Sequence, residues 1–471
     1  MPEEKIRQKL LGKIPGMPAL LNYPEIRALR ESHPALFIND IVRRELDSLR
    51  SFILEAPEED LGKLKINEAD VALRALDIAR RALEPSVRPA INAAGVILHT
   101  ALGRAPLAPA ARESVHRALA GYCTLAINEE SGKRGDRHLH LDRLLAHITG
   151  TEAGIMVNNN AAGTMLILNT LAQGKEVIVS RGQLIEIGGA FRIPEVMERS
   201  GCKLVEVGTT NRTHLRDYEN AITEETAAIL RVHTSNYRII GFHSEVPLKD
   251  LAALGRRHGL PVIDDLGSGA LVDLSQYGLP KEPLVQESVR DGMDVICFSG
   301  DKMLGGPQGG YLIGKKEIIE RVKKNPLARA LRCDKMSYAA AEATLKLYLE
   351  PEKLTKTHPV LSMITEQPAS VKRRTQALRR RLLSEVEGKA ELSIVPGETE
   401  MGSGSLPGKS IPTFILQLKP LKSSPDELGK RLRLGRPPVF TRIADETVIF
   451  DLRTVFRGEE KILADCILAA L

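Results

Sequence analysis

The sequence predicts an α/β protein with a mainly parallel sheet domain, a helical N-terminal domain and a small C-terminal α/β domain. From about residue 90, short β-branched runs alternate with helical stretches, which is typical of buried parallel strands joined by helices. Before that point, the apolar residues follow helical spacing. The 471 residues are enough for several domains of roughly 100–200 residues each.

The composition is that of an ordinary globular protein, with 43% hydrophobic and 27% charged residues. It argues against disordered, collagen-like and fibrous chains. The longest uncharged run, residues 153–174, contains four asparagines and a glutamine, so it is a poor membrane span. The charged N-terminus lacks the apolar stretch of a signal peptide. We therefore expect a cytoplasmic protein with no membrane partner.

The cysteines and histidines do not predict a metal site. The five cysteines are scattered and include no C-x-x-C pair, which disfavours zinc fingers, disulfide frameworks and redox pairs. His138 and His140 have no third ligand spaced to join them. The formal net charge of +6 permits a polyanionic partner without requiring one.

Residues 1–85 are predicted to form a helical domain. Apolar residues recur at three- and four-residue spacing in residues 41–54 and 69–83. Four prolines divide the earlier stretch into short pieces. Residues 1–88 hold 15 basic and 15 acidic residues, so charge alone does not mark this segment as a nucleic-acid binder.

The large α/β domain is expected over residues 86–330, because the apolar runs typical of strands lie within it. Ligands bind in such folds at the carboxyl ends of the strands. The predicted strands are 154–157, 176–180, 203–208, 227–232, 261–265, 294–300 and 309–314.

Linker helices are expected over residues 331–364, and the small α/β domain over residues 365–471. The small domain should begin with a strongly basic helix, residues 371–386, which is either a solvated face or a contact for RNA phosphates. The later elements are a Gly/Ser/Pro loop (396–411), a strand (412–418), a helix from Ser424, a hairpin (438–455) and a last helix.

The most informative run is DVICFSGDKMLGGPQGG, residues 294–310. It places Lys302 directly after a buried strand, at the mouth of the sheet. Desolvation there lowers the pKa of a lysine and frees its amine as a nucleophile, which suits a Schiff-base lysine. The alternative is a surface lysine beside a turn.

An acidic pair precedes this lysine by about 40 residues, in PVIDDLGSG (261–269). Pyridoxal 5'-phosphate needs a carboxylate that keeps its pyridine nitrogen protonated. Neighbouring residues on a strand point to opposite faces, so only one of Asp264 and Asp265 should face a cofactor. We prefer Asp264; an ordinary turn or helix-cap aspartate is the alternative.

A third run, MVNNNAAGTML (156–166), ends a strand and opens a helix with small residues. Amides at a helix N-terminus bind anions, so a phosphate is expected at Asn160, Ala161 and Ala162. Ser299 is placed to add a hydroxyl to that phosphate. The alternative is an asparagine that only caps the helix.

In this order, the phosphate loop, the acid and the lysine resemble aspartate-aminotransferase-like (fold type I) pyridoxal phosphate enzymes. Longer strings resemble the bacterial selenocysteine synthases, the L-seryl-tRNA(Sec) selenium transferases, over essentially the whole chain. These strings are residues 91–107, 132–138, 179–197, 232–242, 263–271, 298–310, 325–336, 402–413 and 432–443.

The resemblance implies conversion of L-seryl-tRNA(Sec) to L-selenocysteyl-tRNA(Sec) with selenophosphate. Water is eliminated with the help of pyridoxal 5'-phosphate on Lys302, and selenium adds to a dehydroalanyl intermediate. Arg104, Arg329 and Arg332 correspond to arginines around the selenium donor, and guanidinium groups suit such an oxyanion. Arg329 and Arg332 would share a helix face. Asp301 would assist proton movement.

The resemblance also implies that residues 1–85 bind tRNA(Sec), and that the protein forms a homo-oligomer, commonly a decamer. The sequence departs from the family pattern at Ala94, Ala101 and Gln183. His233 and Asn236 are further candidates near the cofactor, and the residue stacked on its ring is not assigned.

Two rival functions stay open. One is a pyridoxal phosphate-dependent lyase acting on a free amino acid or an amino sugar phosphate, which the helical N-terminal extension disfavours. The other is a non-catalytic tRNA(Sec)-binding homologue, which the presence of Lys302 and Asp264 disfavours.

Overall fold

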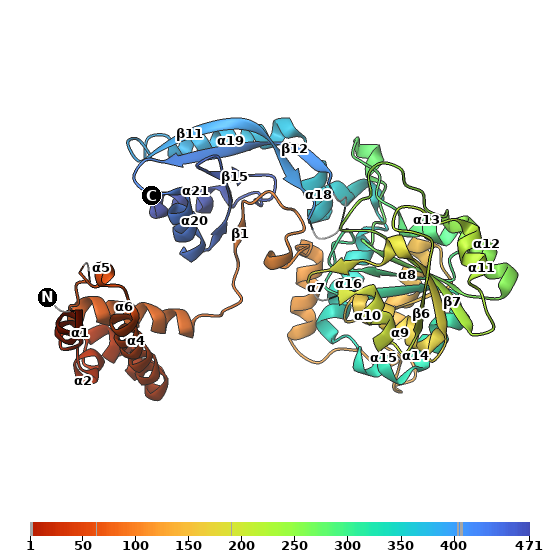
Figure 1. The fold of residues 1–471 in the computed structure, drawn as a ribbon, viewed down its shortest axis with the longest axis horizontal. Coiled ribbons are helices and arrows are strands. Elements are labelled where there is room, and N and C mark those ends of the chain that lie inside the picture. The colour runs from red at the N-terminus through yellow and green to blue at the C-terminus, as the bar shows by residue number, and fades with distance from the viewer. Residues whose placement is uncertain (1–2, 63, 190, 403–404, 406–407) are drawn as a thin grey trace. The chain divides into compact units, whose positions relative to one another are not determined.

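The computed structural model describes residues 3–471 except residues 63, 190, 403–404 and 406–407. The chain divides into two compact units, residues 1–89 and residues 90–471 (Figure 1). The sequence placed the corresponding boundary after residue 85. Among the described helices, none combines the length and the apolar character needed to cross a membrane.

The first unit is helical and has its own hydrophobic core. The long helix α4 supplies much of that core, and α6 packs against it. Asn67 caps α6 by accepting a hydrogen bond from the Asp70 N–H at 2.8 Å, which satisfies one of the free amides of the first turn. The helices of this unit are α1 (Glu3–Leu11), α2 (Met17–Leu21), α3 (Pro24–Ser32), α4 (Ala35–Glu55), α5 (Glu58–Leu61) and α6 (Glu68–Leu83).

A mainly parallel sheet organises the second unit, which confirms the predicted α/β class. Among the described residues, seven strands form it in the order β2-β10-β9-β8-β7-β3-β6. Only β10 runs antiparallel to its neighbours. The strands are β2 (Ala153–Val157), β3 (Glu176–Ser180), β6 (Lys203–Val207), β7 (Thr226–Val232), β8 (Val262–Gly267), β9 (Val295–Ser299) and β10 (Gly310–Gly314).

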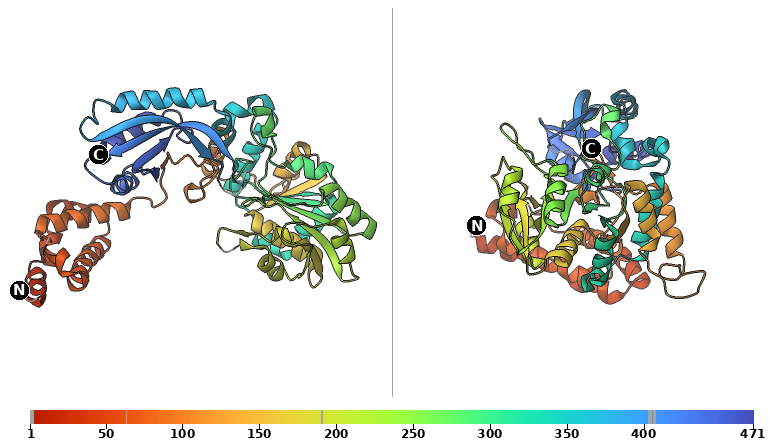
Figure 2. Two further views of the ribbon diagram at one scale, coloured as in Figure 1. Left: turned by 45° about the horizontal axis from the view of Figure 1, so that its top comes forward. Right: turned by 90° about the vertical axis from the view of Figure 1, so that its right-hand side faces the viewer.

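Helices cover both faces of this sheet, as Figures 1 and 2 show. One face packs against α9 (Asn160–Ala172), α10 (Ile193–Arg199) and α14 (Lys316–Lys324). The other packs against α8 (Leu139–Thr149), α12 (Leu248–His258) and α13 (Val285–Arg290). The remaining elements of this region are η1 (Thr100–Leu102), α7 (Pro109–Leu119), η2 (Arg181–Gln183), β4 (Glu186–Ile187), β5 (Phe191–Arg192), α11 (Leu215–Asn220), η3 (Leu274–Tyr277), α15 (Pro326–Ala330) and α16 (Lys335–Leu347).

A second, antiparallel sheet in the order β11-β12-β15-β14 follows a set of short linker helices. The basic helix α19 packs against β12, and it begins at Pro368 and ends at Leu382, not at 371 and 386. The elements are η4 (Pro351–Lys353), α17 (Leu354–Thr357), α18 (Pro359–Thr365), β1 (Ile91–Asn92), α19 (Pro368–Leu382), β11 (Ala390–Glu400), β12 (Ser410–Pro420), α20 (Pro425–Leu434), β13 (Val439–Phe440), β14 (Arg442–Ala444), β15 (Thr447–Asp451) and α21 (Glu460–Ala470).

The predicted loop over residues 396–411 is partly wrong. Residues 396–400 belong to β11, which pairs with β12 along its full length. Pro396 is tolerated because β11 is an edge strand, and Gly397 lies where a Cβ would be 3.0 Å from the side chain of Ile415. Residues 403–404 and 406–407 of this predicted loop lie outside the described residues.

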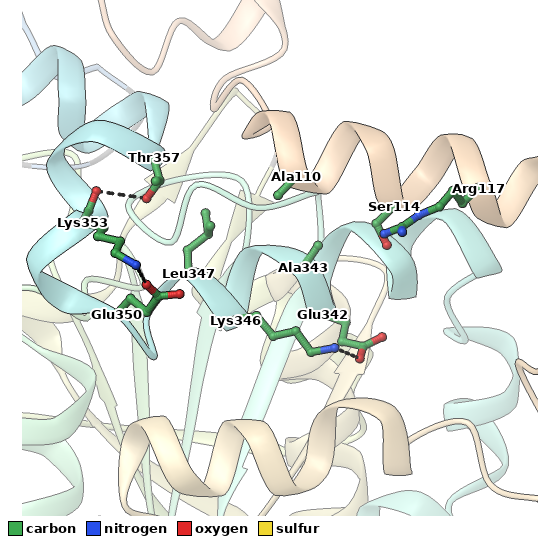
Figure 3. Close-up of a pocket in the computed structure, with 10 residues that line it drawn as sticks. All are labelled: Ala110, Ser114, Arg117, Glu342, Ala343, Lys346, Leu347, Glu350, Lys353 and Thr357. Carbon is green, nitrogen blue, oxygen red and sulfur yellow. Dashed lines mark hydrogen bonds and ion pairs between the residues drawn. The ribbon is translucent and has the colours of Figure 1, made fainter.

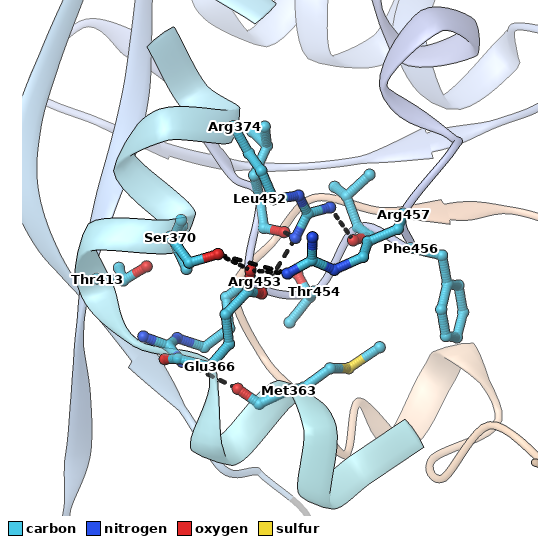
Figure 4. A network of polar contacts seen from close by, with 12 residues as sticks. Met363, Glu366, Ser370, Arg374, Thr413, Leu452, Arg453, Thr454, Phe456 and Arg457 are labelled. Atoms are coloured by element: carbon cyan, nitrogen blue, oxygen red, sulfur yellow. Dashed lines mark hydrogen bonds and ion pairs between the residues drawn. The ribbon is translucent and has the colours of Figure 1, made fainter. Parts of the chain in front are cut away.

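A buried arginine network ties the linker helices to the second sheet (Figure 4). Arg453 donates hydrogen bonds to the carbonyls of Met363, Glu366 and Pro412 at 2.9, 2.6 and 2.6 Å. Arg374 pairs with Glu366 at 3.1 Å. Burial lowers the pKa of Arg453, and the nearby carboxylates oppose this shift. The C-terminal end of α18 is therefore fixed to the second sheet by charge-assisted hydrogen bonds.

Candidate active site

The turn after β9 holds Lys302 in a buried position, with 7% of the residue exposed. Asp301 accepts a hydrogen bond from Nη1 of Arg104 at 2.7 Å. The Met303 N–H donates to the carbonyl of Ser268 at 3.1 Å, which connects this turn to the loop after β8. The lysine is thus attached to the loop that follows the acidic pair.

Strand alternation separates the two aspartates of β8. Asp265 lies on the face that carries Ile263 and α9, while Asp264 lies on the opposite face with Val262. Asp264 is fully buried and pairs with Arg231 at 3.0 Å. The sequence favoured Asp264 as the cofactor partner, but in the structure its carboxylate accepts hydrogen bonds from Arg231 and from Ser288 on the face opposite α9.

Asp265 is held by two donors from α9. Asn160 donates from Nδ2 to one carboxylate oxygen at 2.7 Å, and Thr164 donates from its hydroxyl to the other at 3.0 Å. Asn160 and Thr164 are one helical turn apart, so they face the same way. Sequence reasoning missed Thr164, although its four-residue spacing from Asn160 was the available signal.

The N-terminus of α9 opens into the same region. Asn159 caps the helix by accepting a hydrogen bond from the Ala162 N–H at 2.9 Å. Asn160, Ala161 and Ser299 line the adjoining cavity, whereas Ala162 is not among its lining residues. The groups predicted to bind a phosphate at this cavity are therefore the first residues of α9 and the Ser299 hydroxyl.

These groups enclose a cavity of about 340 Å³. One part of its wall is apolar, and the other carries the polar and charged groups described above. Besides those groups, the lining includes Ile185, Ile187, Gly188, Phe191, Val232, His233, Ser235, Gly267 and Gln308. A mixed wall of this kind suits a flat ring with a charged substituent.

Burial and neighbouring charges shift the pKa values of the ionisable groups in the cavity. Burial lowers the pKa of Lys302 and the Arg104 charge lowers it further, while Asp265 and Asp301 oppose the shift. Burial raises the pKa of Asp265 against the hydrogen bonds from Asn160 and Thr164. A lowered pKa increases the fraction of Lys302 present as the free amine, which is the nucleophilic form.

The residues fit pyridoxal 5'-phosphate. Two buried polar atoms of cavity residues, Asn160 Oδ1 and His233 Nδ1, have no hydrogen-bond partner among the residues that the structure describes. A buried carboxylate, a desolvated lysine and a helix N-terminus are the three groups that the cofactor's ring nitrogen, aldehyde and phosphate require.

Arg329 and Arg332 lie apart from this lining. Arg329 is on α15, which ends at Ala330, so Arg332 follows the helix and the predicted shared helical face was wrong. The backbone of Arg332 bridges to Val157, at the end of β2. The neighbouring charges of Arg137, Arg329 and Arg134 lower the pKa of Arg332, together with partial desolvation. This cluster of positive charge is suited to an anion.

Four further residues singled out in the sequence have clear positions. Gln183 is buried and accepts a hydrogen bond from the Val232 N–H at 3.1 Å, so it supports the end of β7. Asn236 donates to the carbonyl of Glu186 at 2.6 Å, whereas His233 lines the cavity. Ala101 lies in η1 and is exposed.

A second cavity, of about 310 Å³, lies between α7 and α16 (Figure 3). Its charged side chains pair locally, Lys346 with Glu342 and Lys353 with Glu350. It brings together none of the residues predicted for the active site. Among the described residues, no group of three or more histidine, cysteine, aspartate or glutamate side chains could hold a metal ion.

Comparison with known proteins places these features in one family. The family model described as SelA: L-seryl-tRNA selenium transferase matches residues 90–456. The chain is 47% identical to the L-seryl-tRNA(Sec) selenium transferase of Nitratidesulfovibrio vulgaris, covering 95% of this chain and 96% of the relative. The enzyme of the same name from Carboxydothermus hydrogenoformans is also 47% identical, with 96% of each covered.

Among solved structures, D-glucosaminate-6-phosphate ammonia-lyase has a similar fold, with a TM-score of 0.57 and 20% identity. The match covers 83% of this chain and 97% of that chain. At this level of identity, the likeness concerns the fold alone.

Proposed function

The chain belongs to the L-seryl-tRNA selenium transferase family, and we propose that Lys302 and Asp265 are the residues on which its chemistry depends. The predicted enzyme class and its reaction, from L-seryl-tRNA(Sec) to L-selenocysteyl-tRNA(Sec), are confirmed. The predicted cofactor, pyridoxal 5'-phosphate, is confirmed as well. The observation that supports the residue roles is the burial of Lys302 in the same cavity as Asp265.

Pyridoxal 5'-phosphate, when bound, supplies an electron sink for the bonds at the seryl Cα. Asp265 holds a proton at the pyridine nitrogen, and Asn160 and Thr164 keep both of its oxygens oriented. The N-terminus of α9 and the Ser299 hydroxyl would bind the phosphate. Lys302 would hold the cofactor through Nζ, and its amine would accept the proton from the seryl Cα.

Arg104 lines the same cavity and pairs with Asp301, the residue before Lys302. In our proposal, it binds the selenium donor, selenophosphate, and the positive charge of Arg329 and Arg332, outside the lining of this cavity, also serves to attract that anion. Asp301 orients the Arg104 guanidinium and assists proton movement. A guanidinium group offers two parallel N–H donors to an oxyanion, which makes arginine the suitable residue.

The remaining parts of the proposal concern the partners. Residues 1–85 bind tRNA(Sec), residues 86–330 carry the cofactor, residues 331–364 link the two α/β parts, and residues 365–471 form the small domain. The protein works in the cytoplasm as a homo-oligomer, with a decamer as the expected form. Family membership and the separate helical unit support these assignments.

Incubation of the purified full chain with seryl-tRNA(Sec) and selenophosphate tests the function. We expect selenocysteine to be identified on the tRNA after mild deacylation. Ordinary seryl-tRNA(Ser) serves as the matched substrate control and should stay unchanged. A relative of known activity, given the same tRNA preparation, serves as the positive control. If that relative forms selenocysteine and this chain yields only serine from tRNA(Sec), the proposal is contradicted.

A further inference from the structure

The backbone immediately after Lys302 is fixed by a buried histidine and a tyrosine. His358 approaches the carbonyl of Leu304 with Nε2 at 2.8 Å, and Tyr348 approaches the same carbonyl with its hydroxyl at 2.9 Å. His358 is fully buried. Two side chains from the linker region therefore converge on one backbone oxygen, two residues after the lysine.

The hydrogen bonds of His358 fix its tautomer. The Leu361 N–H can only donate, so Nδ1 of His358 accepts this bond, which is 3.2 Å long. In a neutral imidazole, Nε2 then carries the hydrogen and donates to Leu304. Burial lowers the pKa of His358, which favours the neutral ring. His358 is thus both the N-cap of α18 and a donor to the lysine turn.

The turn is shaped to accept this ring. Gly305 has φ +70°, and a Cβ at that position would overlap the ring of His358. The Gly305 N–H donates to the carbonyl of Lys302 at 3.0 Å, which closes the turn. The ring therefore occupies the space that a side chain at residue 305 would need.

Helix α18 connects this contact to the second sheet. His358 caps its first turn, and Arg453 donates to the Met363 carbonyl near its last turn at 2.9 Å. The helix thus reaches from the turn of Lys302 to the sheet that follows the linker helices. Its two ends are fixed by different side chains, so the contact with the lysine turn can be removed separately.

We propose that His358 and Tyr348 are positioning residues for Lys302, which act by fixing the Leu304 carbonyl. This inference rests on the proposed role of Lys302. Removing either donor lets the turn relax toward the cavity, so the amine becomes better hydrated. Lys302 then loses part of its desolvation, and both its reactivity and its alignment change.

Three variants separate this role from the capping role. Tyr348→Phe removes one donor at nearly constant volume. His358→Asn keeps a capping acceptor for α18 but is too short to reach Leu304, and His358→Gln restores a reaching donor. The matched controls are Tyr122→Phe and His116→Asn, which alter exposed residues.

Competitive acetylation of the full-length protein, freed of cofactor and read by mass spectrometry across pH, reports the protonation of Lys302. We expect the pH at which Lys302 is half-reactive toward acetylation to rise by about half a pH unit or more in Tyr348→Phe and His358→Asn. With the cofactor restored, kcat should fall roughly 5- to 10-fold while KM for seryl-tRNA(Sec) changes less than about twofold. His358→Gln should recover part of both effects.

An unchanged Lys302 midpoint in both variants, in a protein that still unfolds cooperatively, would overturn the inference. Failure of the proposed function has a different signature, because the wild-type protein would then transfer no selenium. The acetylation midpoint decides the positioning role in either case.

Discussion

Arg104 and Asp301 form an ion pair of 2.7 Å beside Lys302. A backbone hydrogen bond links the same two segments, since the Ala105 N–H donates to the carbonyl of Asp301 at 3.1 Å. Arg104 has φ +58°, in the left-handed region that non-glycine residues rarely adopt. Such a conformation persists where its surroundings hold it, often at functional sites. The guanidinium is therefore kept at the cavity, next to the lysine.

Replacing Arg104, Arg329 or Arg332 with glutamine should impair selenium transfer and leave cofactor binding intact. Loss of a charge-assisted contact costs about 1.5–3 kcal/mol, or roughly 10- to 150-fold in a dependent step. Single-turnover transfer from selenophosphate measures the effect, with the exposed Arg112→Gln as control. Parental rates in all three variants would remove the arginines from the donor site.

Asp265→Asn and Asp264→Asn should have different effects, although the residues are neighbours. Asp265→Asn removes the group that holds the pyridine proton, so we expect kcat to fall about 100-fold or more. Asp264→Asn breaks the buried pair with Arg231, so we expect lower stability, by about 3–5 kcal/mol, as the main effect. Steady-state kinetics and urea unfolding of both variants distinguish the two roles. A larger kcat loss for Asp264→Asn would reverse our assignment.

The sequence predicted the strands of the large sheet and the position of Lys302, because apolar β-branched runs and a strand-end lysine are local signals. It could not decide between Asp264 and Asp265. Alternation shows that two neighbours face opposite ways, but which face carries α9 depends on tertiary packing. The end of α15 before Arg332 was missed for a related reason, since helix ends depend on contacts beyond the local pattern.

The stability of the full chain should fall as the pH is lowered from about 6.5 toward 4, because of His233. Burial, with a smaller contribution from the Arg231 charge, lowers the pKa of His233 from 6.5 to about 4. Between these two values, the unfolded state binds a proton that the folded state does not. The free energy of unfolding therefore falls by up to roughly 3 kcal/mol as the pH is lowered. Urea unfolding at pH 7 and pH 5 should show a larger loss for the wild type than for His233→Gln. Equal losses in the two proteins would contradict this assignment.

Deleting residues 1–85 should keep the cofactor and weaken tRNA(Sec) binding. Every predicted cofactor residue lies after residue 150, and residues 90–471 contain their own hydrophobic cores. Structured RNA is read largely by shape, which suits a helical unit of balanced charge. Titration against tRNA(Sec) and tRNA(Ser) at one fixed salt concentration measures the change. Unaltered discrimination between the two tRNAs would transfer recognition to the basic helix α19.

Borohydride reduction of the full-length holoenzyme, followed by peptide mapping, tests the central claim about Lys302 most directly. Reduction makes the bond between the cofactor and its lysine permanent, so the modified residue can be identified by mass. We expect one modified peptide, which contains Lys302. The label should be absent in Lys302→Ala and unchanged in the exposed control Lys316→Ala. A cofactor label on any other lysine of the wild-type protein would contradict the account.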